Sequence, residues 1–534
     1  MKNFTQAILQ PQEHFSRIIK NIPANMKFAF AAAVIIFAAV HGFGFLHKFL
    51  NEDSMYHFHS SLGYLYQSGR WALVGLQHIR GFYNAPWIIG LFAMAYMSIG
   101  INLATWVLGI KNRLYIVVCA ILIITFPAWA NQFMYDFMAD AYPAAFLLAT
   151  AAIAACKKWK FGFVAGGFAL MLSMALYQSF LGFAIGLALI VLIRQIMEKS
   201  PTTKEILMTG LRFLICGILG AVLYYASVQV SLLITGGQLW DYQGMDGMGS
   251  LSFSQIPSSI VAAYTGFFQG FVPAEGVVIN NLAVSNGLFV LYVIAFLLTM
   301  YLVVRSLFAD VYKDTFNIAR TLILVVLLAL LPLGLNIVVV LAPDAWHHTL
   351  VKNPFVLALI LPLTLLDIAS GKKEKSAAPH FYIKAAVIAV AILISGNYLR
   401  QTSSFYFVQH IQYERTAHFY NRLLMRIESH AGYEVGMPVA VIGTAPFPHI
   451  GQSDALSAES WQIVGLHAER PAIGLSEWQK GVNFIQNYLG VAITPATREQ
   501  TAAIQETAEF WQMPLYPRDG SLQIINGVLV VRLN

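Results

Sequence analysis

The sequence predicts an all-α polytopic membrane protein of about 11 transmembrane helices, followed by a small C-terminal α/β domain. Of its 534 residues, 58% are hydrophobic and only 11% are charged, whereas a soluble domain carries about 25% charged residues. Apolar runs recur up to residue 397, and the composition becomes polar beyond residue 400. The net charge of +7 comes from scattered basic residues, which argues against a disordered or nucleic-acid-binding chain.

Eleven apolar runs account for the transmembrane helices. A bilayer core of about 30 Å requires about 20 helical residues. By that measure, spans are expected at residues 28–46, 87–108, 114–131, 138–156, 161–177, 179–196, 206–231, 285–304, 318–340, 354–370 and 382–397. The long run 161–196 is divided at Tyr177, Gln178 and Ser179. The first run begins near Lys27 after a polar start without a cleavable signal, so we expect a cytoplasmic N-terminus.

The distribution of basic residues supports this topology, because short cytoplasmic loops are enriched in Lys and Arg. It places 20 of the 33 Lys and Arg residues inside and 4 outside, with the other 9 beyond residue 399. The four outside are Lys48, Arg70, Arg80 and Lys352. An odd number of spans then puts the C-terminal domain outside, on the periplasmic side of a bacterial inner membrane.

The expected boundaries are residues 1–399 for the transmembrane domain, with outer-face loops 47–86 and 235–287, and 400–534 for the periplasmic α/β domain. The latter shows no nucleotide-binding fingerprint, so we expect it to recognise or support rather than to catalyse.

Four local patterns predict the structure of the C-terminal domain. We expect an amphipathic helix at 403–430, a strand at 439–442, a helix that starts at Thr494-Pro495 and a hairpin turned by Asn526-Gly527.

The first outside loop begins with two acids, Glu52 and Asp53. Apolar residues follow them at three- and four-residue spacing, which predicts an interfacial helix anchored by Trp71. Asp53 would then lie just above the membrane, where a carboxylate can take a proton from a hydroxyl nucleophile, a role worth about 10²–10⁴ in rate. The alternative is that the two acids only solvate the end of a span.

A second polar group lies where two spans begin at the outer surface. Asp136 and Asp140 are four residues apart and would share one helix face. Two carboxylates repel unless a cation or sugar hydroxyls satisfy them, so we expect these to bind sugar or to pair with arginine. Tyr177 and Gln178 would lie in the same layer.

Arg70 and Arg80 lie on an outer face that is otherwise poor in basic groups. A guanidinium binds phosphate through a planar fork of donors, so both are candidates for contact with a lipid phosphate. Pairing with the acids of the first loop or with lipid head groups is the alternative.

Lys352, with His347 and His348, offers a second phosphate contact. Adjacent histidines do not face one another on a helix, so no metal site is expected there. The sequence indicates no cofactor and leaves a divalent metal open. The glycine-rich outside loop 235–287 fits either an interfacial lid over a lipid-linked substrate or a packed structural loop.

Short motifs throughout the chain resemble those of the polytopic Gtr-type glucosyltransferases that modify bacterial O-antigen, members of the wider GT-C class. The motifs are Glu52-Asp53, Gly69-Arg70-Trp71, Tyr135-Asp136, Asp140-Ala141-Tyr142, Ala175-Leu176-Tyr177-Gln178, and at the C-terminus Met513-Pro514, Tyr516-Pro517, Asp519-Gly520 and Gly527–Leu533.

The resemblance implies a GT-C-like fold and transfer of glucose from a polyprenyl-phosphate carrier to a periplasmic glycan acceptor, such as the O-antigen of lipopolysaccharide. The acidic pair of the family would correspond to Glu52 and Asp53. The family often shows two aspartates there, so Asp53 is the better candidate for the base.

Other function classes fit parts of the sequence. A flippase or transporter of a lipid-linked sugar would also have many spans and a few acids, but the acids lie near one face, and the two halves show no repeat. A ligase, or a transferase of phosphoethanolamine or of another sugar, would share the architecture.

Overall fold

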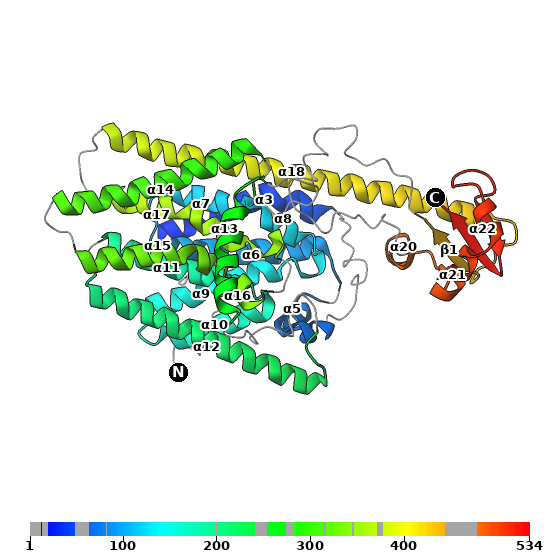
Figure 1. Ribbon diagram of the computed structural model, residues 1–534, viewed down its shortest axis with the longest axis horizontal. Coiled ribbons are helices and arrows are strands. Elements are labelled where there is room, and N and C mark those ends of the chain that lie inside the picture. Colours follow the sequence, from blue (N-terminus) through cyan, green and yellow to red (C-terminus); the bar gives the residue numbers. More distant parts are fainter. Residues whose placement is uncertain are drawn as a thin grey trace.

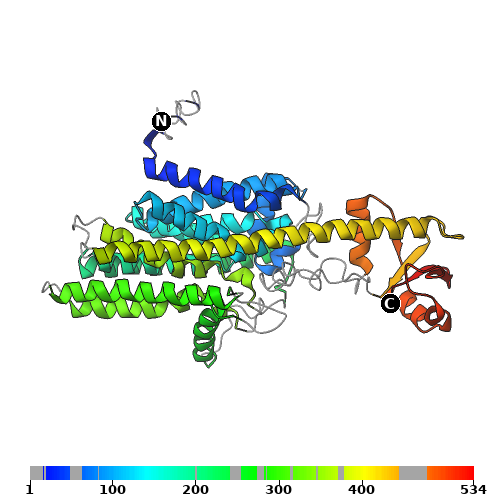
Figure 2. The same cartoon turned by 90° about the horizontal axis from the view of Figure 1, so that it is seen from above.

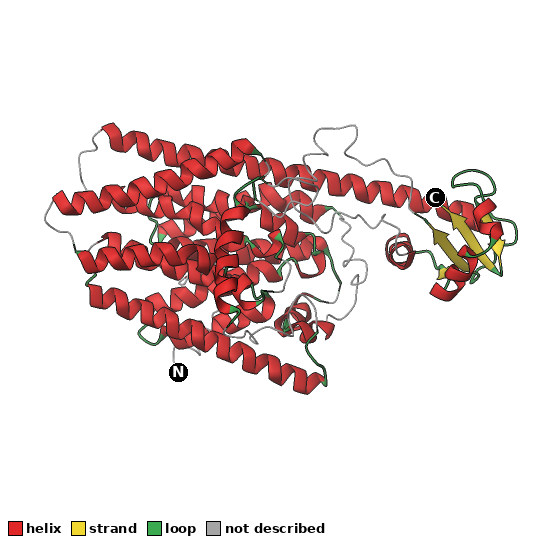
Figure 3. Ribbon diagram, viewed as in Figure 1, coloured by secondary structure: helices red, strands yellow, loops and turns green. Residues whose placement is uncertain are grey.

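The computed structural model describes residues 20–47, 63–81, 83–198, 201–240, 254–273, 282–283, 285–312, 317–343, 347–370, 378–443 and 478–533, with two isolated positions nearer the N-terminus. These residues form a bundle of long helices and a small C-terminal domain with a sheet (Figures 1 and 3).

The bundle consists of long helices joined by shorter ones. The long helices are α3 (Ala24–Leu46), α6 (Pro86–Val107), α7 (Arg113–Thr125), α9 (Ala141–Lys158), α10 (Gly162–Leu176), α11 (Phe180–Glu198), α12 (Thr203–Thr235), α14 (Asn286–Tyr312), α15 (Ile318–Leu335), α17 (Val356–Ser370) and α18 (Ala378–Glu428). The shorter elements are η1 (Gly63–Ser68), α5 (Trp71–Arg80), α8 (Pro127–Phe133), η2 (Asp136–Met138), α13 (Ile256–Gly270), α16 (Ile337–Leu341), η3 (Thr349–Val351) and η4 (Asn353–Phe355).

The predicted class, an all-α polytopic membrane protein, is confirmed. Among the described residues, eight helices are long and apolar enough to cross a membrane, and α7 with α8 makes a ninth if the bent pair counts as one span. Helix α10 and the segment Asn353–Ile368 are apolar but shorter. Each of the eleven predicted spans therefore coincides with an apolar helix, but two of them are too short to qualify by length.

Helix α18 connects the two parts of the molecule. It is 51 residues long in all. Its first part lies along the side of the bundle, and the helix continues without a break into the C-terminal domain (Figure 2). The predicted boundary at residue 400 falls within it, and the predicted helix 403–430 corresponds to its last part, which ends at Glu428. At one end of the bundle, α18 continues toward the C-terminal domain. We call this end of the bundle the "domain end".

The third predicted span, 114–131, is bent by 47° between α7 and α8. Pro127 is the first residue of α8 and has no N–H to donate, while Phe126 before it is forced out of the helical region, with φ −58° and ψ 127°. The bend places α8 at the domain end, where it packs against α18 and η3.

An ionic cluster joins the helices at the opposite end of the bundle. Arg194 of α11 contacts Asp367 of α17 at 3.5 Å and Glu198 at 2.6 Å. Asp367 also accepts hydrogen bonds from the backbone N–H groups of Lys111 and Asn112, each at 3.0 Å. The turn between α6 and α7 is thereby tied to α11 and α17.

Helix α13 lies across the other helices rather than along them (Figure 2). Phe267 packs against Phe355 with ring centres 4.9 Å apart, while Val261 and Phe268 on its other side are exposed. Helix α13, the main described part of loop 235–287, thus has one packed face and one exposed apolar face, and the interfacial lid and the packed loop both stay predictions. Its acids, Asp241, Asp246 and Glu275, lie outside the described residues.

The C-terminal domain has a four-stranded sheet in the order β2-β1-β4-β3 (Figure 3). The strands are β1 (Pro438–Ile442), β2 (Thr494–Pro495), β3 (Leu522–Ile525) and β4 (Val528–Arg532), with helices α20 (Trp478–Phe484), η6 (Ile485–Leu489), α21 (Arg498–Gln505) and α22 (Ala508–Gln512). Strand β1 pairs in parallel with β2 and β4, whereas β3 and β4 are antiparallel.

Two of the local predictions in this domain are confirmed and one is wrong. The strand at 439–442 is β1, and Asn526 and Gly527 turn the β3–β4 hairpin with φ of 51° and 75°. Thr494-Pro495 does not start a helix, because it pairs with β1 as β2. The next helix is capped by Thr497, whose hydroxyl accepts from the N–H of Gln500.

Candidate functional site

The polar residues predicted for the outer face lie at the domain end wherever the structure describes them. These residues are Arg70, Arg80, Asp136, Asp140, Tyr177, Gln178, His347, His348 and Lys352. The two predicted catalytic acids, Glu52 and Asp53, lie outside the described residues, as does most of the predicted interfacial helix behind them. From Gly63 onward the loop forms η1 and α5.

Arg80 and Asp140 form a buried ion pair. Arg80 ends α5, and its Nη1 lies 2.7 Å from Oδ1 of Asp140, which precedes α9. The two side chains are only 2% and 0% exposed, and Nη2 of Arg80 also donates to the carbonyl of Phe137. This contact joins the first loop to the start of the fourth span. For Asp140, the structure therefore shows pairing with arginine, one of the two predicted alternatives.

Arg70 lies at the break between α10 and α11. Its Nε donates to Oε1 of Gln178 at 3.4 Å, and its guanidinium lies 5.0 Å from the centre of the Tyr177 ring. Gln178 in turn donates to the hydroxyl of Tyr224 at 2.9 Å and to the carbonyl of Ser68 at 3.1 Å. The sequence predicted Tyr177 and Gln178 in the layer of Asp136 and Asp140, and the structure shows that both contact Arg70.

Asp136 differs from Asp140 in its surroundings. It begins the 3-10 turn η2, is partly exposed, and accepts a hydrogen bond from the N–H of Phe137 at 2.7 Å. Burial raises the pKa of Tyr488 in the C-terminal domain, and the charge of Asp136 raises it further. The ring of Tyr488 stacks on Phe484 at 5.2 Å. The α20–η6 segment lies on the side of its domain that faces the bundle (Figure 1).

The segment that carries His347, His348 and Lys352 is largely buried. His348 and Lys352 are 8% and 7% exposed. Burial lowers the pKa of Lys352 to about 8, and burial together with the nearby charge of Lys352 lowers the pKa of His347, which favours a neutral imidazole at pH 7. Within the described ranges, no three His, Cys, Asp or Glu side chains gather as metal ligands would.

A set of buried polar side chains lies on α8 and on the segments η3, η4 and α18 near it, and sequence reasoning missed it. We call it the α8 polar shell; its members are Trp129, Gln132, Thr349, Asn353, Gln401 and Thr402. All six are at most 2% exposed, and each has at least one side-chain N or O atom that lacks a hydrogen-bond partner in the described part of the chain. Buried polar groups are nearly always paired, so six such groups around one short helix indicate a place that receives a polar ligand.

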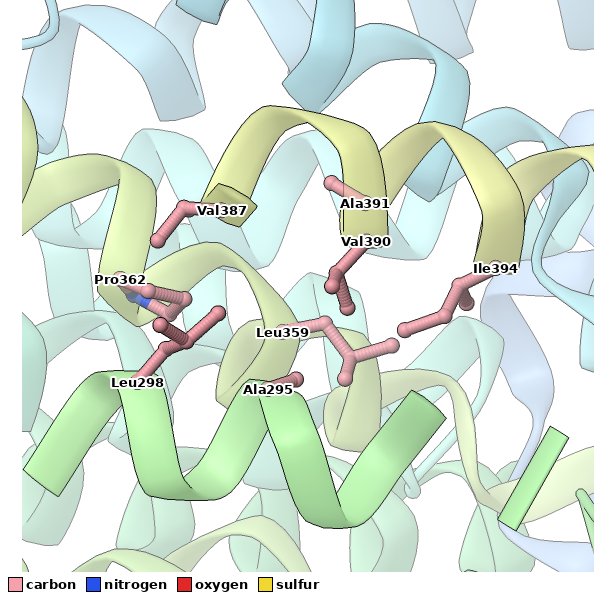
Figure 4. Close-up of a pocket in the computed structure, with 8 residues that line it drawn as sticks. All are labelled: Ala295, Leu298, Leu359, Pro362, Val387, Val390, Ala391 and Ile394. Carbon is pink, nitrogen blue, oxygen red and sulfur yellow. The ribbon is translucent and has the colours of Figure 1, made fainter. Parts of the chain in front are cut away.

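Two other hollows of the bundle are apolar. A small pocket between α14, α17 and α18 is lined by side chains that converge from the three helices (Figure 4): Ala295, Leu298, Leu359, Pro362, Val387, Val390, Ala391 and Ile394. A larger groove of about 520 Å³ runs between α11 and α12 and includes Leu181, Ile185, Leu189, Leu214 and Ile218. Both suit hydrocarbon and not a sugar or an ion.

Fold and site together define a multi-pass membrane protein with a polar, charged site at one end of its helix bundle. The sequence model of the family described as "Glucosyl transferase GtrII" matches residues 42–366, more than half of the chain. The chain belongs to this family of glucosyltransferases. No curated protein and no solved structure gave a match.

The match covers almost every element that builds the site. It begins within α3 and ends within α17, so it includes Arg70, Arg80, Asp140 and η3–η4. Helix α18 and the C-terminal domain follow it. Membership of the family therefore concerns the bundle, and the role of the domain must be argued from this chain.

Proposed function

We propose that this glucosyltransferase takes its glucosyl group from polyprenyl-phosphate-glucose and transfers it to a periplasmic glycan, such as the O-antigen of lipopolysaccharide. The observation that carries the proposal is the family match over residues 42–366, the part of the chain that holds the charged and polar residues of the domain end. The protein would reside in the bacterial inner membrane, with its N-terminus in the cytoplasm and residues 400–534 in the periplasm.

The contacts of Arg70 support a lipid-linked donor. The apolar groove between α11 and α12 includes Leu181, which is one helical turn beyond Gln178, the partner of Arg70. A phosphate near Arg70 would therefore leave its hydrocarbon chain at the entrance of a groove without charged side chains. Lys352, charged below pH about 8, is the second basic group available for the phosphate.

Chemistry would follow by direct displacement. Asp53 accepts the proton of an acceptor hydroxyl, whose oxygen forms the bond to the anomeric carbon. The bond from that carbon to the phosphate oxygen breaks, and the electron pair leaves with the polyprenyl phosphate, whose charge Arg70 stabilises. Glu52 assists as the neighbouring acid. Asp136 is positioned for a sugar hydroxyl, whereas Arg80 and Asp140 position α5 against α9.

Replacement of Asp53 tests the assignment of the base. We expect Asp53→Asn to lower the transfer of labelled glucose from the lipid carrier to the glycan by about 10²–10⁴-fold, the usual contribution of a general base. The measurement is the initial rate in membranes that contain equal amounts of the two proteins.

Asp519→Asn is the matched control, because Asp519 is fully exposed in the C-terminal domain and contacts only Arg426, at 3.2 Å, in the described chain. It should transfer like the wild type. Near-native transfer by Asp53→Asn would exclude Asp53 as the base. A wild-type protein that moves the glucosyl lipid across the membrane without changing any glycan would instead be a flippase.

A further inference from the structure

We propose that the α8 polar shell is the binding site for the sugar ring that is transferred, with Trp129, Gln132, Thr349 and Asn353 as its hydrogen-bonding residues. The proposal rests on the glucosyl transfer proposed above and adds which part of the fold recognises the sugar.

Three segments that are distant in sequence meet at α8. Gln132 of α8 donates to the carbonyl of Leu350 in η3 at 2.6 Å. The Trp129 ring lies 5.7 Å from that of Phe180, the first residue of α11. Helix α18 packs on α8 from another side. The short helix is therefore enclosed by η3, by the start of α11 and by α18.

The connection continues to η4. A methyl group at Gly182 of α11 would lie 3.2 Å from the ring of Pro354, the residue after Asn353. The turn that carries Asn353 is thus held close to the start of α11, one turn beyond Tyr177 and Gln178. The shell accordingly lies beside Tyr177 and Gln178, which contact Arg70.

The unpaired atoms of the shell are a mixture of donors and acceptors. The indole N–H of Trp129 is a donor, Oε1 of Gln132 is an acceptor, the hydroxyl of Thr349 is both, and Asn353 offers one of each. Sugar hydroxyls donate and accept in turn, so they match such a set. A phosphate would require donors alone, and a metal ion acceptors alone.

The position of Lys352 agrees with a sugar phosphate. It separates η3 from η4 and so lies between Thr349 and Asn353 in the chain, with its side chain 7% exposed. A glucosyl group in the shell would place its phosphate near a cation. Buried polar groups without partners are costly. A bound sugar would supply the partners that the side chains of the shell lack.

Thr349→Val and Asn353→Leu test the proposal, because each removes hydrogen-bonding atoms at nearly constant volume. If these atoms serve the substrate and not the fold, both variants should melt at or above the wild-type temperature. Both should also lower kcat/KM for citronellyl-phosphate-glucose, a short soluble donor analogue, by about tenfold each, which corresponds to about 1.4 kcal/mol.

Thr364→Val is the matched control. Thr364 is a fully buried threonine of α17, and its hydroxyl donates to the carbonyl of Ile360 at 3.3 Å. This variant should leave kcat/KM unchanged. The comparison separates a loss at the α8 polar shell from the general effect of removing a buried hydroxyl.

Deoxy-glucosyl donors give a readout that a structural role would not change. For the sugar hydroxyl that Thr349 contacts, the deoxy donor should react equally fast with wild type and Thr349→Val, while the other deoxy donors keep the tenfold difference. A uniform loss with all donors, or unchanged kinetics, would overturn the proposal but leave the proposed function intact. Failure of the wild type to transfer glucose at all would overturn both.

Discussion

Arg80 and Asp140 set the geometry of the domain end at the scale of single residues. Their pair is buried and joins α5 to α9 through one short contact. Two charges without water are stabilised mainly by each other, so loss of one leaves the other uncompensated. The sequence predicted that Asp140 binds sugar or pairs with an arginine, and that Arg80 contacts a lipid phosphate, an acid of the first loop or a lipid head group. The pairing of the two, 60 residues apart, required the fold.

Single and double variants of this pair should therefore differ. We expect Asp140→Asn to destabilise the protein by about 3–5 kcal/mol, because it leaves the guanidinium of Arg80 buried alone. The double variant Arg80→Gln with Asp140→Asn should recover part of that loss, since neither charge remains. Thermal unfolding of the purified protein in detergent measures both.

The exposed pair Arg426–Asp519 provides the comparison, because a pair in water contributes little. Asp519→Asn should leave the melting temperature nearly unchanged. A double variant that is no more stable than Asp140→Asn would show that the pair does not act through its charges.

The residues that sequence reasoning missed are neutral. Trp129, Gln132 and Thr349 lie within or beside apolar runs, where one polar residue changes the mean hydropathy little. Charged residues were found because a charge in a membrane protein is costly and therefore conspicuous. A neutral amide or hydroxyl becomes informative only when the fold shows that it is buried without a partner.

At the scale of elements, the apolar helices and the break at Tyr177, Gln178 and Ser179 were predictable, whereas the bend in the third span was not anticipated. The predicted span 114–131 passed over Pro127, which bends the chain by 47°. Pro127 is the feature of the sequence from which this bend could have been predicted. The η3 and η4 turns could not be anticipated, because the burial of His348 and Lys352 depends on packing of η3 against α8 and of η4 against α11.

Helix α18 allows the C-terminal domain to be rotated without altering either part. One alanine inserted after His410 should turn the domain by about 100° and shift it by about 1.5 Å, since the helix is continuous there. Tyr488 would then move away from Asp136, whose charge raises the pKa of Tyr488. We expect the KM for the glycan acceptor to rise severalfold and the KM for the lipid donor to stay constant.

An alanine inserted after Val435, which is 91% exposed and lies beyond α18, is the control and should have no effect. Unchanged acceptor kinetics after the insertion at His410 would mean that the domain does not contribute to acceptor binding.

At the scale of the whole molecule, the two ends of the helix bundle carry different polar groups. Arg194 and Asp367 hold the end away from the domain with contacts that are all internal. The domain end carries the α8 polar shell, Arg70 and the segment that faces the C-terminal domain. The family match includes both ends of the bundle, so the difference between the ionic cluster at one end and the α8 polar shell at the other comes from the structure and not from the match.

The orientation of these two ends in the membrane follows from the basic residues, and it can be measured. Single cysteines at Val435 and Lys160, both exposed and at opposite ends, would report it. The native Cys119, Cys156 and Cys216 are buried, so they should react little. In intact spheroplasts, a membrane-impermeant maleimide should label Val435→Cys and not Lys160→Cys, because 20 of the 24 Lys and Arg residues before residue 400 are predicted inside. Permeabilised cells should label both. The reverse pattern in spheroplasts would place the sugar site in the cytoplasm, where a nucleotide-linked donor and not a polyprenyl-linked one would be at hand.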